Sequence, residues 1–501
     1  MAVRLSHRCC SHPDGSIDPI AATQYFKTKT LKASRVITQV CSVCRSPNLL
    51  QLVWVLCVGA LLFNTYRLYK GGYFGLDDFN NLYGVQQNSF ADMIGYILNP
   101  VSSYFRPTGM LCYWILLRFF DLNPAAYHCL TWSLHAANTA LMYFLLKRFT
   151  QSRPGAAVGA MLFASQAVFA AIYWDFGTIF ELVAAFFSFL GIFLWTSERR
   201  GWLRVLFASL ALLLAIEGKE MALTMPIIWL SYDLLLRKNM VRRMAAHWIL
   251  PSGLALLRPT RLVSLWYGLS NAAAMRGDPT SDPYYMSITG STLASGFGIY
   301  FNMLLGTNFP WQNWCIGFVV LLLVFACLRN RLALFFQSYV IIAFLPVIFL
   351  INHRSEFYWY LPFLGVSGLA AMLAKTVAVP IETRSPHWLV ECGASVVFIL
   401  LCWGTFLVHE EANRPQRSWE RALTGEYRAF VTGLRALPAP PPGETIFFDS
   451  QPSLFDEDLL LAATQVALGR TDIHAKLVAE FPPEARYRLR FQESRLVQLP
   501  R

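Results

Sequence analysis

Two adjacent carboxylates, Asp77 and Asp78, stand in a polar stretch of an otherwise apolar chain. This stretch, residues 71–107, follows the first hydrophobic run and ends with an aromatic-Arg-Pro step at Arg106. A carboxylate beside a membrane is costly unless it is paired, solvated or used. One interpretation is a helix cap, because acids before Phe79 suit the first turn of a helix. The other is chemistry, since a carboxylate near a hydroxyl can act as its general base.

Other polar side chains are expected on the same side of the membrane as the acid pair. The connections between predicted spans place these residues there: Arg106, His128, His135, Asn138, Asp175, Glu181, Glu217, Lys219, Glu220, His353, Arg354, Glu356, Tyr358 and Tyr360. A departing phosphate needs cations to hold its charge. The cations available for this are Arg106, Lys219, His353 and Arg354. The set therefore predicts transfer from a lipid-phosphate donor, whose apolar tail would lie between helices.

Each of these residues also has a structural interpretation. His128 and His135 suit hydrogen-bonded packing between helices as well as ligand binding. Lys219 and Glu220 can form a local ion pair of little consequence, and a buried Glu181 can be neutral. Their gathering at one face, rather than any single residue, favours chemistry.

The composition predicts a polytopic membrane protein. The chain has 501 residues, of which 55% are hydrophobic and 14% charged, with a mean hydropathy of +0.42. Soluble domains carry about a quarter charged residues. The net charge of +12 is typical of basic cytoplasmic connections that contact anionic lipids. No motif for RNA or DNA accompanies it, so nucleic acid is not an expected partner.

The apolar runs predict an all-α bundle of about eleven transmembrane helices, within a range of about 10 to 13. The expected spans are 49–66, 125–149, 155–173, 176–196, 202–216, 221–236, one from about 245, 314–328, 332–351, 358–373 and 387–408, with 108–120 as an interfacial helix. Whether 291–309 also crosses is decided by charge, because crossing would move Arg329 and Arg331 outside. A non-crossing segment puts the N-terminus in the cytoplasm and the C-terminus outside.

The division into domains follows the change in polarity along the chain. We expect a basic cytoplasmic tail at 1–48, a transmembrane catalytic domain at 49–409 and a small extracytoplasmic α/β domain at 410–501. In that last part, "TIFFDS" predicts a strand, 454–468 a helix and "YRLRFQESRLVQLP" a hairpin. Cys41 and Cys44, with cysteines and histidines upstream, suit either a zinc site or reduced thiols.

Five stretches together resemble the GT-C-fold integral-membrane glycosyltransferases. They are "LDDF", "YFRPTGMLCYWILLRFFDLNPAAYHCLTWSLHAANTALMYFLLKRF", "YWDFGTIFEL", "GKEMALTMPIIWLSYDLLL" and "EFYWYLPFLGVSGL", in family order over about residues 71–374. The nearest group is that of the protein O-mannosyltransferase-like enzymes, including the membrane half of those that carry tetratricopeptide repeats. Two departures stand out. Phe357 occupies the place of a family arginine, which leaves Arg354 to serve, and the repeats are absent.

The resemblance implies a hexosyltransferase, with mannose as one candidate sugar, that uses a polyprenyl-phosphate donor on the extracytoplasmic side with inversion at the sugar. It implies Asp78 or Asp77 as the base and places Lys219 and Glu220 near the donor. The acceptor is left open among protein, lipid and glycan. A divalent cation, Mg or Mn, occurs in some members, but no metal ligand is predicted here. The expected location is a bacterial inner membrane. The alternatives are a transporter or flippase of lipid-linked glycans, which symmetric halves would favour, and a glycan ligase or polymerase.

Overall fold

A computed structural model describes residues 72–99, 101–102, 104–173, 175–197, 201–237, 250–253, 285–384 and 387–500, together with Gly59 and Ala255. The basic tail, the Cys41 and Cys44 pair, the predicted first span apart from Gly59 and most of the predicted span from residue 245 lie outside these residues.

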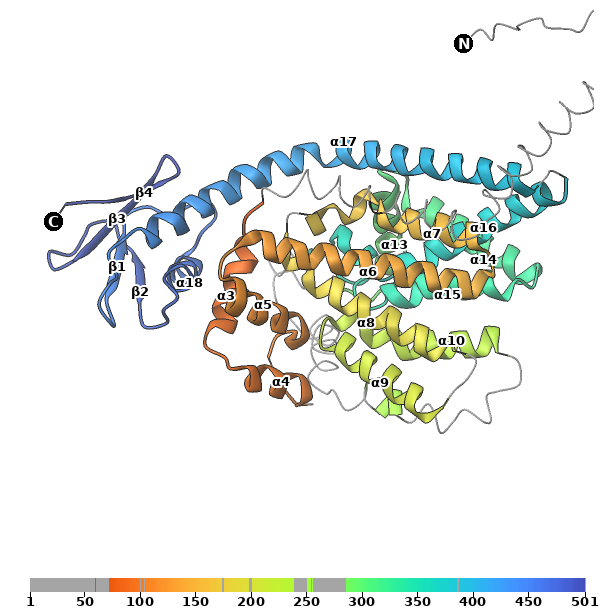
Figure 1. The fold of residues 1–501 in the computed structure, drawn as a ribbon, viewed down its shortest axis with the longest axis horizontal. Coiled ribbons are helices and arrows are strands. Elements are labelled where there is room, and N and C mark those ends of the chain that lie inside the picture. Colours follow the sequence, from red (N-terminus) through yellow and green to blue (C-terminus); the bar gives the residue numbers. More distant parts are fainter. Residues whose placement is uncertain are drawn as a thin grey trace, which may run out of the picture.

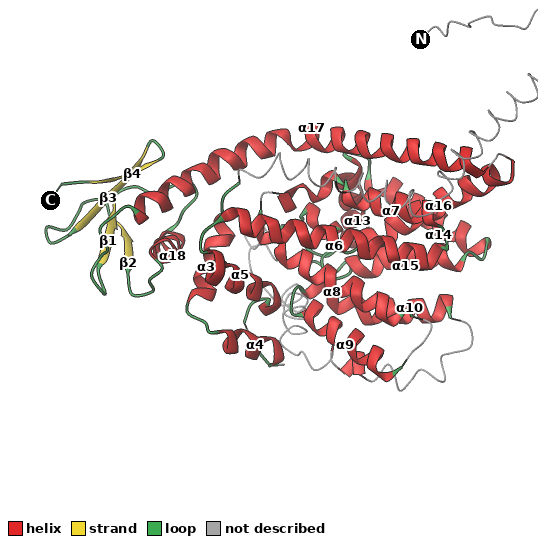
Figure 2. Cartoon of the chain, in the orientation of Figure 1, coloured by secondary structure: helices red, strands yellow, loops and turns green. Residues whose placement is uncertain are grey.

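Helices form nearly all of the described chain up to residue 435 (Figures 1 and 2). They are α3 Leu76–Gln86, α4 Phe90–Leu98, α5 Pro107–Phe120, α6 Pro124–Thr150, α7 Arg153–Ala164, η1 Ala167–Tyr173, η2 Phe176–Thr178, α8 Ile179–Trp195, α9 Trp202–Ile216, η3 Glu220–Thr224, α10 Met225–Leu236, α13 Gly290–Leu305, α14 Trp311–Cys327, α15 Arg331–Phe344, η4 Glu356–Trp359, α16 Phe363–Arg384 and α17 His387–Arg435.

Small residues allow the central helices to approach closely. Helix α6 packs on α7 and α8, and α7 packs on α16. A Cβ built at Gly155 would lie 2.4 Å from the carbonyl oxygen of Ala371, and one at Gly159 would lie 2.6 Å from that of Ser367. Larger residues would therefore separate α7 from α16, as expected of small residues at membrane helix contacts.

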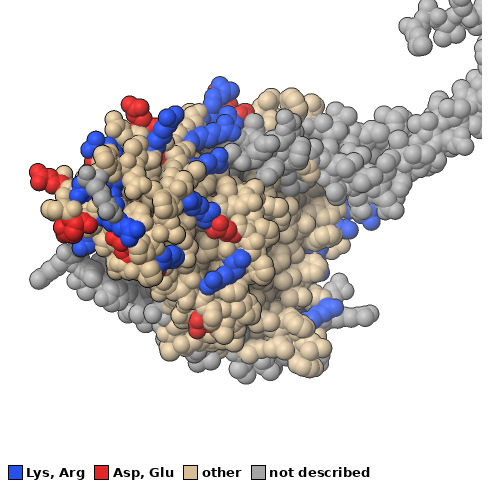
Figure 3. All heavy atoms as spheres, turned by 60° about the vertical axis from the view of Figure 1, so that its left-hand side comes forward, with Lys and Arg blue, Asp and Glu red and all other residues tan. Residues whose placement is uncertain are grey.

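Among the described residues, one helical stretch is by itself long and apolar enough to cross a membrane, at 176–195. Shorter apolar helices cover 202–216, 311–327, 331–344 and 363–376. Helix α14 is apolar and has no buried residue, with Ile316 62% and Leu323 56% exposed. A helix of this kind suits contact with lipid rather than water. Figure 3 shows charged side chains gathered at one end, beside a broad uncharged surface.

Several predicted spans differ from the observed helices. The span predicted at 155–173 is divided, because α7 ends at Ala164 and a 3-10 helix follows. The stretch 291–309, which the distribution of charge predicted not to cross the membrane, contains the helix α13. The span predicted to end at residue 408 belongs to α17, which continues as one helix of 49 residues to Arg435 and lies along the outside of the bundle (Figure 1).

The chain after α17 folds into a small sheet with one helix. Its elements are β1 Thr445–Phe448, α18 Glu457–Leu468, β2 His474–Leu477, β3 Tyr487–Gln492 and β4 Arg495–Gln498. The strand order is β2-β1-β3-β4, in which β1 pairs in parallel with β2 and β3, and β3 pairs antiparallel with β4. The sequence analysis expected β1, α18 and the β3-β4 hairpin, but it did not identify β2.

This C-terminal unit shares a hydrophobic core with α3. Phe79 is fully buried and its ring lies 6.2 Å from that of Tyr427 and 6.0 Å from that of Phe455. The side chain of Gln86 donates to the backbone oxygen of Gln465 at 3.2 Å. The same core includes residues of α5, α6 and α8. The C-terminal unit therefore packs directly on the helix that carries the acid pair.

Candidate active site

The two neighbouring acids of α3 have different surroundings. The carboxylate of Asp78 is fully buried. It accepts hydrogen bonds from the Tyr113 hydroxyl at 2.6 Å and from the Gly75 backbone N–H at 2.8 Å. Asp77 is exposed and lines a cavity. The structure thus assigns the helix-capping interpretation to Asp78, while Asp77 is the acid accessible to a ligand.

The cavity has a volume of about 240 Å³ and lies where α3, the start of α5, the start of α8, the connection after α9 and the segment 353–358 meet. Its lining residues are Asp77, Asn80, Asn81, Phe105, Arg106, Asp175, Gly177, Thr178, Phe180, Glu181, Lys219, His353, Phe357 and Tyr358. Six of the ten residues predicted from the sequence are among them: Asp77, Arg106, Glu181, Lys219, His353 and Tyr358.

Arg106 is held by its backbone and by an acid from a distant segment. It precedes Pro107 in a left-handed conformation, with φ of 42°, which is uncommon for a residue other than glycine. Its guanidinium binds both carboxylate oxygens of Glu220, the shortest contact being 3.0 Å. The Thr108 N–H donates to the Glu217 carbonyl at 3.1 Å and ties the same two segments together. Strain of this kind is typical of sites where a side chain must be aimed.

Lys219 forms an ion pair with Glu181 inside the cavity. Its ammonium also lies 5.0 Å from the centre of the Tyr358 ring. Burial, and then the charge of Arg106, lower the pKa of Lys219 well below its usual value. Burial opposes ionisation of Glu220, but the Arg106 guanidinium outweighs it and lowers the pKa of Glu220 to about 2. The structural alternative for Lys219 and Glu220 in the sequence was a local ion pair between the two. Instead, each binds a different partner.

Burial also raises the pKa of two acids, Asp175 in the cavity and Asp78 beside it. It raises the pKa of Asp78 to about 7, against the opposing hydrogen bonds from Tyr113 and Gly75. Burial, together with the nearby charge of Asp78, raises the pKa of Asp175 well above its usual value. Asp175 was expected on the same side of the membrane as the acid pair, but it was not predicted as a site residue. Its position between two spans on that side could have indicated that it belongs to the site.

The remaining predicted residues do not line the cavity. His128 is buried in the first turns of α6, Glu220 reaches the site only through Arg106, and the Arg354 Nε donates to the Leu350 carbonyl at 2.9 Å. His135 contacts the Tyr360 hydroxyl at 2.8 Å within the bundle, as its packing interpretation suggested. Within the described part of the chain, no group of three His, Cys, Asp or Glu side chains is placed to hold a metal ion.

No family model and no curated protein matches the chain. The crystal structure of ArnT from Cupriavidus metallidurans in the apo state resembles it, with a TM-score of 0.51 and 10% sequence identity over 84% of this chain and 85% of that one. The fold is that of ArnT. The structure of ArnT bound to undecaprenyl phosphate aligns over the same shares, with a TM-score of 0.49 and 11% identity.

The likeness to ArnT confirms one part of the sequence analysis. The expected polytopic helical membrane fold is present, at the level of the fold that the chain shares with ArnT. The nearer resemblance to O-mannosyltransferase-like enzymes is not confirmed and stays a prediction.

Proposed function

We propose that this chain is a membrane glycosyltransferase that moves a sugar from a polyprenyl phosphate to the hydroxyl of an extracytoplasmic acceptor. The observation that carries the proposal is the cavity that joins the accessible carboxylate of Asp77 to the cations Arg106 and Lys219. General-base catalysis and stabilisation of a phosphate leaving group require these two kinds of side chain close together. ArnT, whose fold the chain shares, has been crystallised with undecaprenyl phosphate.

The proposed reaction is a single displacement at the anomeric carbon of the sugar. Asp77 takes the proton of the acceptor hydroxyl, whose oxygen attacks that carbon. The bond from the carbon to the phosphate oxygen breaks, with inversion, and polyprenyl phosphate leaves with both electrons. Arg106 and Lys219 hold the charge that develops on the phosphate. Burial, followed by the charges of Lys219 and Arg106, lowers the pKa of His353, so its neutral ring serves as a hydrogen-bonding partner for the substrate.

Asp78 is assigned a positioning role in this proposal. Its hydrogen bonds to Gly75 and Tyr113 fix the first turn of α3 and thereby orient the neighbouring Asp77. Ion pairing of Arg106 with Glu220 and of Lys219 with Glu181 holds both cations at the cavity wall before the donor binds. The cavity end of the bundle would face outward, with the N-terminus in the cytoplasm and residues 410–501 outside. The acceptor is one of protein, lipid or glycan.

The experiment is release of sugar from a panel of polyprenyl-phosphate sugars by the full chain in nanodiscs, with membrane extract as acceptor source. Asp77→Asn should lower turnover by about 10²- to 10⁴-fold while donor binding is kept. Asp92→Asn is the matched control, because Asp92 is an exposed helix-capping acid on the neighbouring helix α4 and should leave turnover unchanged. Full activity of Asp77→Asn would refute its role as base.

The panel also separates the alternatives. Movement of labelled lipid across the bilayer by the wild type, without consumption of any donor, would replace the proposal with transport. Consumption of oligosaccharide donors alone would indicate a ligase or polymerase.

A further inference from the structure

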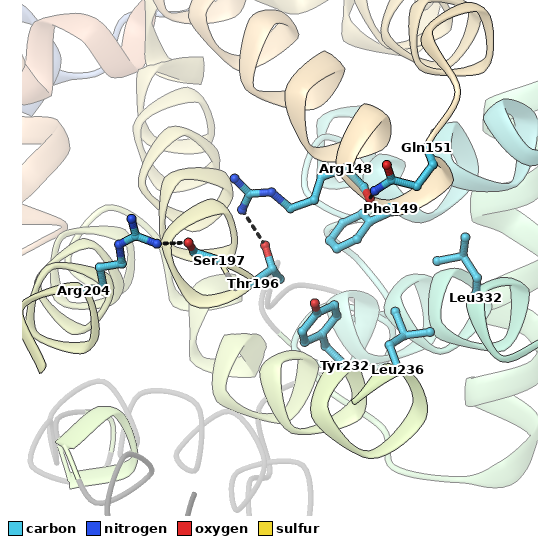
Figure 4. A pocket seen from close by; sticks show the side chains of 9 residues that line it. All are labelled: Arg148, Phe149, Gln151, Thr196, Ser197, Arg204, Tyr232, Leu236 and Leu332. Carbon is cyan, nitrogen blue, oxygen red and sulfur yellow. Dashed lines mark hydrogen bonds between the residues drawn. The ribbon is translucent and has the colours of Figure 1, made fainter. Parts of the chain in front are cut away.

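A second cavity lies where α6, α9, α10, α15 and the end of α8 meet, and Figure 4 shows the side chains that line it. It has a volume of about 510 Å³ and is lined by Arg148, Phe149, Gln151, Thr196, Ser197, Arg204, Tyr232, Leu236 and Leu332. Glu181 belongs to the first cavity and Thr196 to the second, and α8 runs between them. At 1.5 Å per residue these two positions are about 22 Å apart along the helix. The second cavity is therefore separate from the candidate active site.

Arginines from two helices converge on the end of α8 at this cavity. The Nη1 of Arg148 donates to the Phe193 carbonyl at 2.5 Å and to the Thr196 hydroxyl at 3.0 Å. Arg204, from helix α9, points to the Ser197 hydroxyl. Figure 4 shows the side chains of Arg148 and Arg204 both directed at the end of α8. These acceptors are uncharged.

A third guanidinium stands beside the cavity. Arg237 donates through Nη2 to the Ser197 carbonyl at 2.8 Å. Its Nη1 lies 3.9 Å from a carboxylate oxygen of Asp233, which also accepts from Trp195 Nε1 at 3.1 Å and does not line the cavity. None of the nine lining residues is acidic. A guanidinium group presents several N–H donors in one plane, which is the geometry that binds phosphate oxygens in pairs.

The remaining wall of the cavity is apolar. Phe149, Leu236 and Leu332 form it. A free anion would need only the polar part of this cavity. Arginines beside an apolar wall match a molecule with a phosphate at one end and hydrocarbon at the other.

We propose that this cavity binds the phosphate headgroup of an anionic membrane lipid. The phosphate oxygens would contact Arg148 and Arg204, and an acyl chain would lie along Phe149, Leu236 and Leu332. The sequence that flanks the lining residues has more bases than acids, with Lys147, Arg199, Arg200 and Lys238 against the acids Glu198 and Asp233. Basic segments at a membrane surface attract anionic lipid. This proposal is independent of the glycosyltransferase assignment, because it uses none of the same residues.

The test is lipid retention by the full chain in detergent micelles, measured by native mass spectrometry with phosphatidylglycerol or phosphatidylcholine added. We expect the anionic lipid to be retained, and Arg204→Gln to weaken its retention about tenfold, as for a lost charge-assisted contact. Arg204→Glu should weaken it further. Arg204 is exposed, so these changes leave the fold intact. Arg329→Gln is the control, because this exposed arginine lies outside the cavity.

Three results would overturn the proposal. The first is equal retention of the two lipids, and the second is equal retention by wild type and both Arg204 variants. The third is binding of inorganic phosphate alone, sensitive to Arg204 but without retained lipid, which would make the cavity a site for a free anion.

Discussion

Replacing Asp78 with Asn should change how the stability of the protein depends on pH. Burial raises the pKa of Asp78 from 3.8 to about 7, so the folded state holds the proton more tightly than the unfolded chain. The stabilising effect of this proton is complete below pH 3.8 and is lost as pH rises through 7. Between pH 5 and 8 the loss is on the order of 3 kcal/mol. Asn does not titrate and keeps a hydrogen-bonding oxygen, so the variant lacks this loss.

The assay is thermal unfolding of the full chain in detergent at a fixed scan rate, at pH 5 and at pH 8. For a chain of this length 1 kcal/mol corresponds to about 1 °C in Tm, so the wild type should lose about 3 °C more than Asp78→Asn between the two pH values. Asp92→Asn is the control, because hydrogen bonds to Ser89 lower the pKa of Asp92, and its profile should parallel the wild type. Parallel profiles for Asp78→Asn and wild type would refute the reasoning.

Three further substitutions test the packing around the site. Glu181→Gln leaves the buried Lys219 without its charged partner and should destabilise the protein by about 3–5 kcal/mol, measured by thermal unfolding; a smaller loss after exchanging both residues for Gln and Met would confirm the pairing. Tyr360→Phe removes a hydrogen bond to His135 and should cost about 1–2 kcal/mol in the same assay, without changing donor binding. Phe79→Ala empties a fully buried position and should cost about 3–5 kcal/mol, with faster proteolysis of α3; unchanged proteolysis would contradict the shared core.

The helical membrane fold could be predicted because apolar runs of membrane length leave few alternatives. The exact extent of the helices could not. Helix α7 ends at Ala164 although the apolar pattern continues, since tertiary contacts and not composition decide where the 3-10 segment begins. Helix α17 continues beyond residue 408 because polar residues such as Glu420 and Arg421 form helix readily once the turn before them is helical.

The sequence singled out Asp77 and Asp78 as a pair but did not distinguish the buried acid from the exposed one. The helical periodicity of this segment contained the information that separates the two acids. Phe79, Leu82 and Val85 are the buried face of α3, and Asp78 lies four residues before Leu82 on that face. Asp77 faces away from it.

Pairings between distant segments were beyond prediction. Arg106 and Glu220 are separated by 114 residues, and Lys219 and Glu181 by 38. Local patterns carry no information about which cation meets which acid, because that depends on how the helices pack. The same reason hid Asp175, whose importance comes from the cavity that surrounds it.

The core that α3 shares with the C-terminal unit has a consequence for the order in which the protein is made. Gln86 and Gln465, which are 379 residues apart, are in contact, and Phe79 is buried by Tyr427 and Phe455. During synthesis the helices that precede residue 427 emerge first, but the acid-bearing helix completes its core only when residues 427–465 have been made. A ribosome that stalls before residue 455 would leave a membrane bundle whose acid-bearing helix lacks the contact of Phe455. Under the proposed function, such a nascent copy would have an incompletely packed cavity and would be poorly able to use the donor.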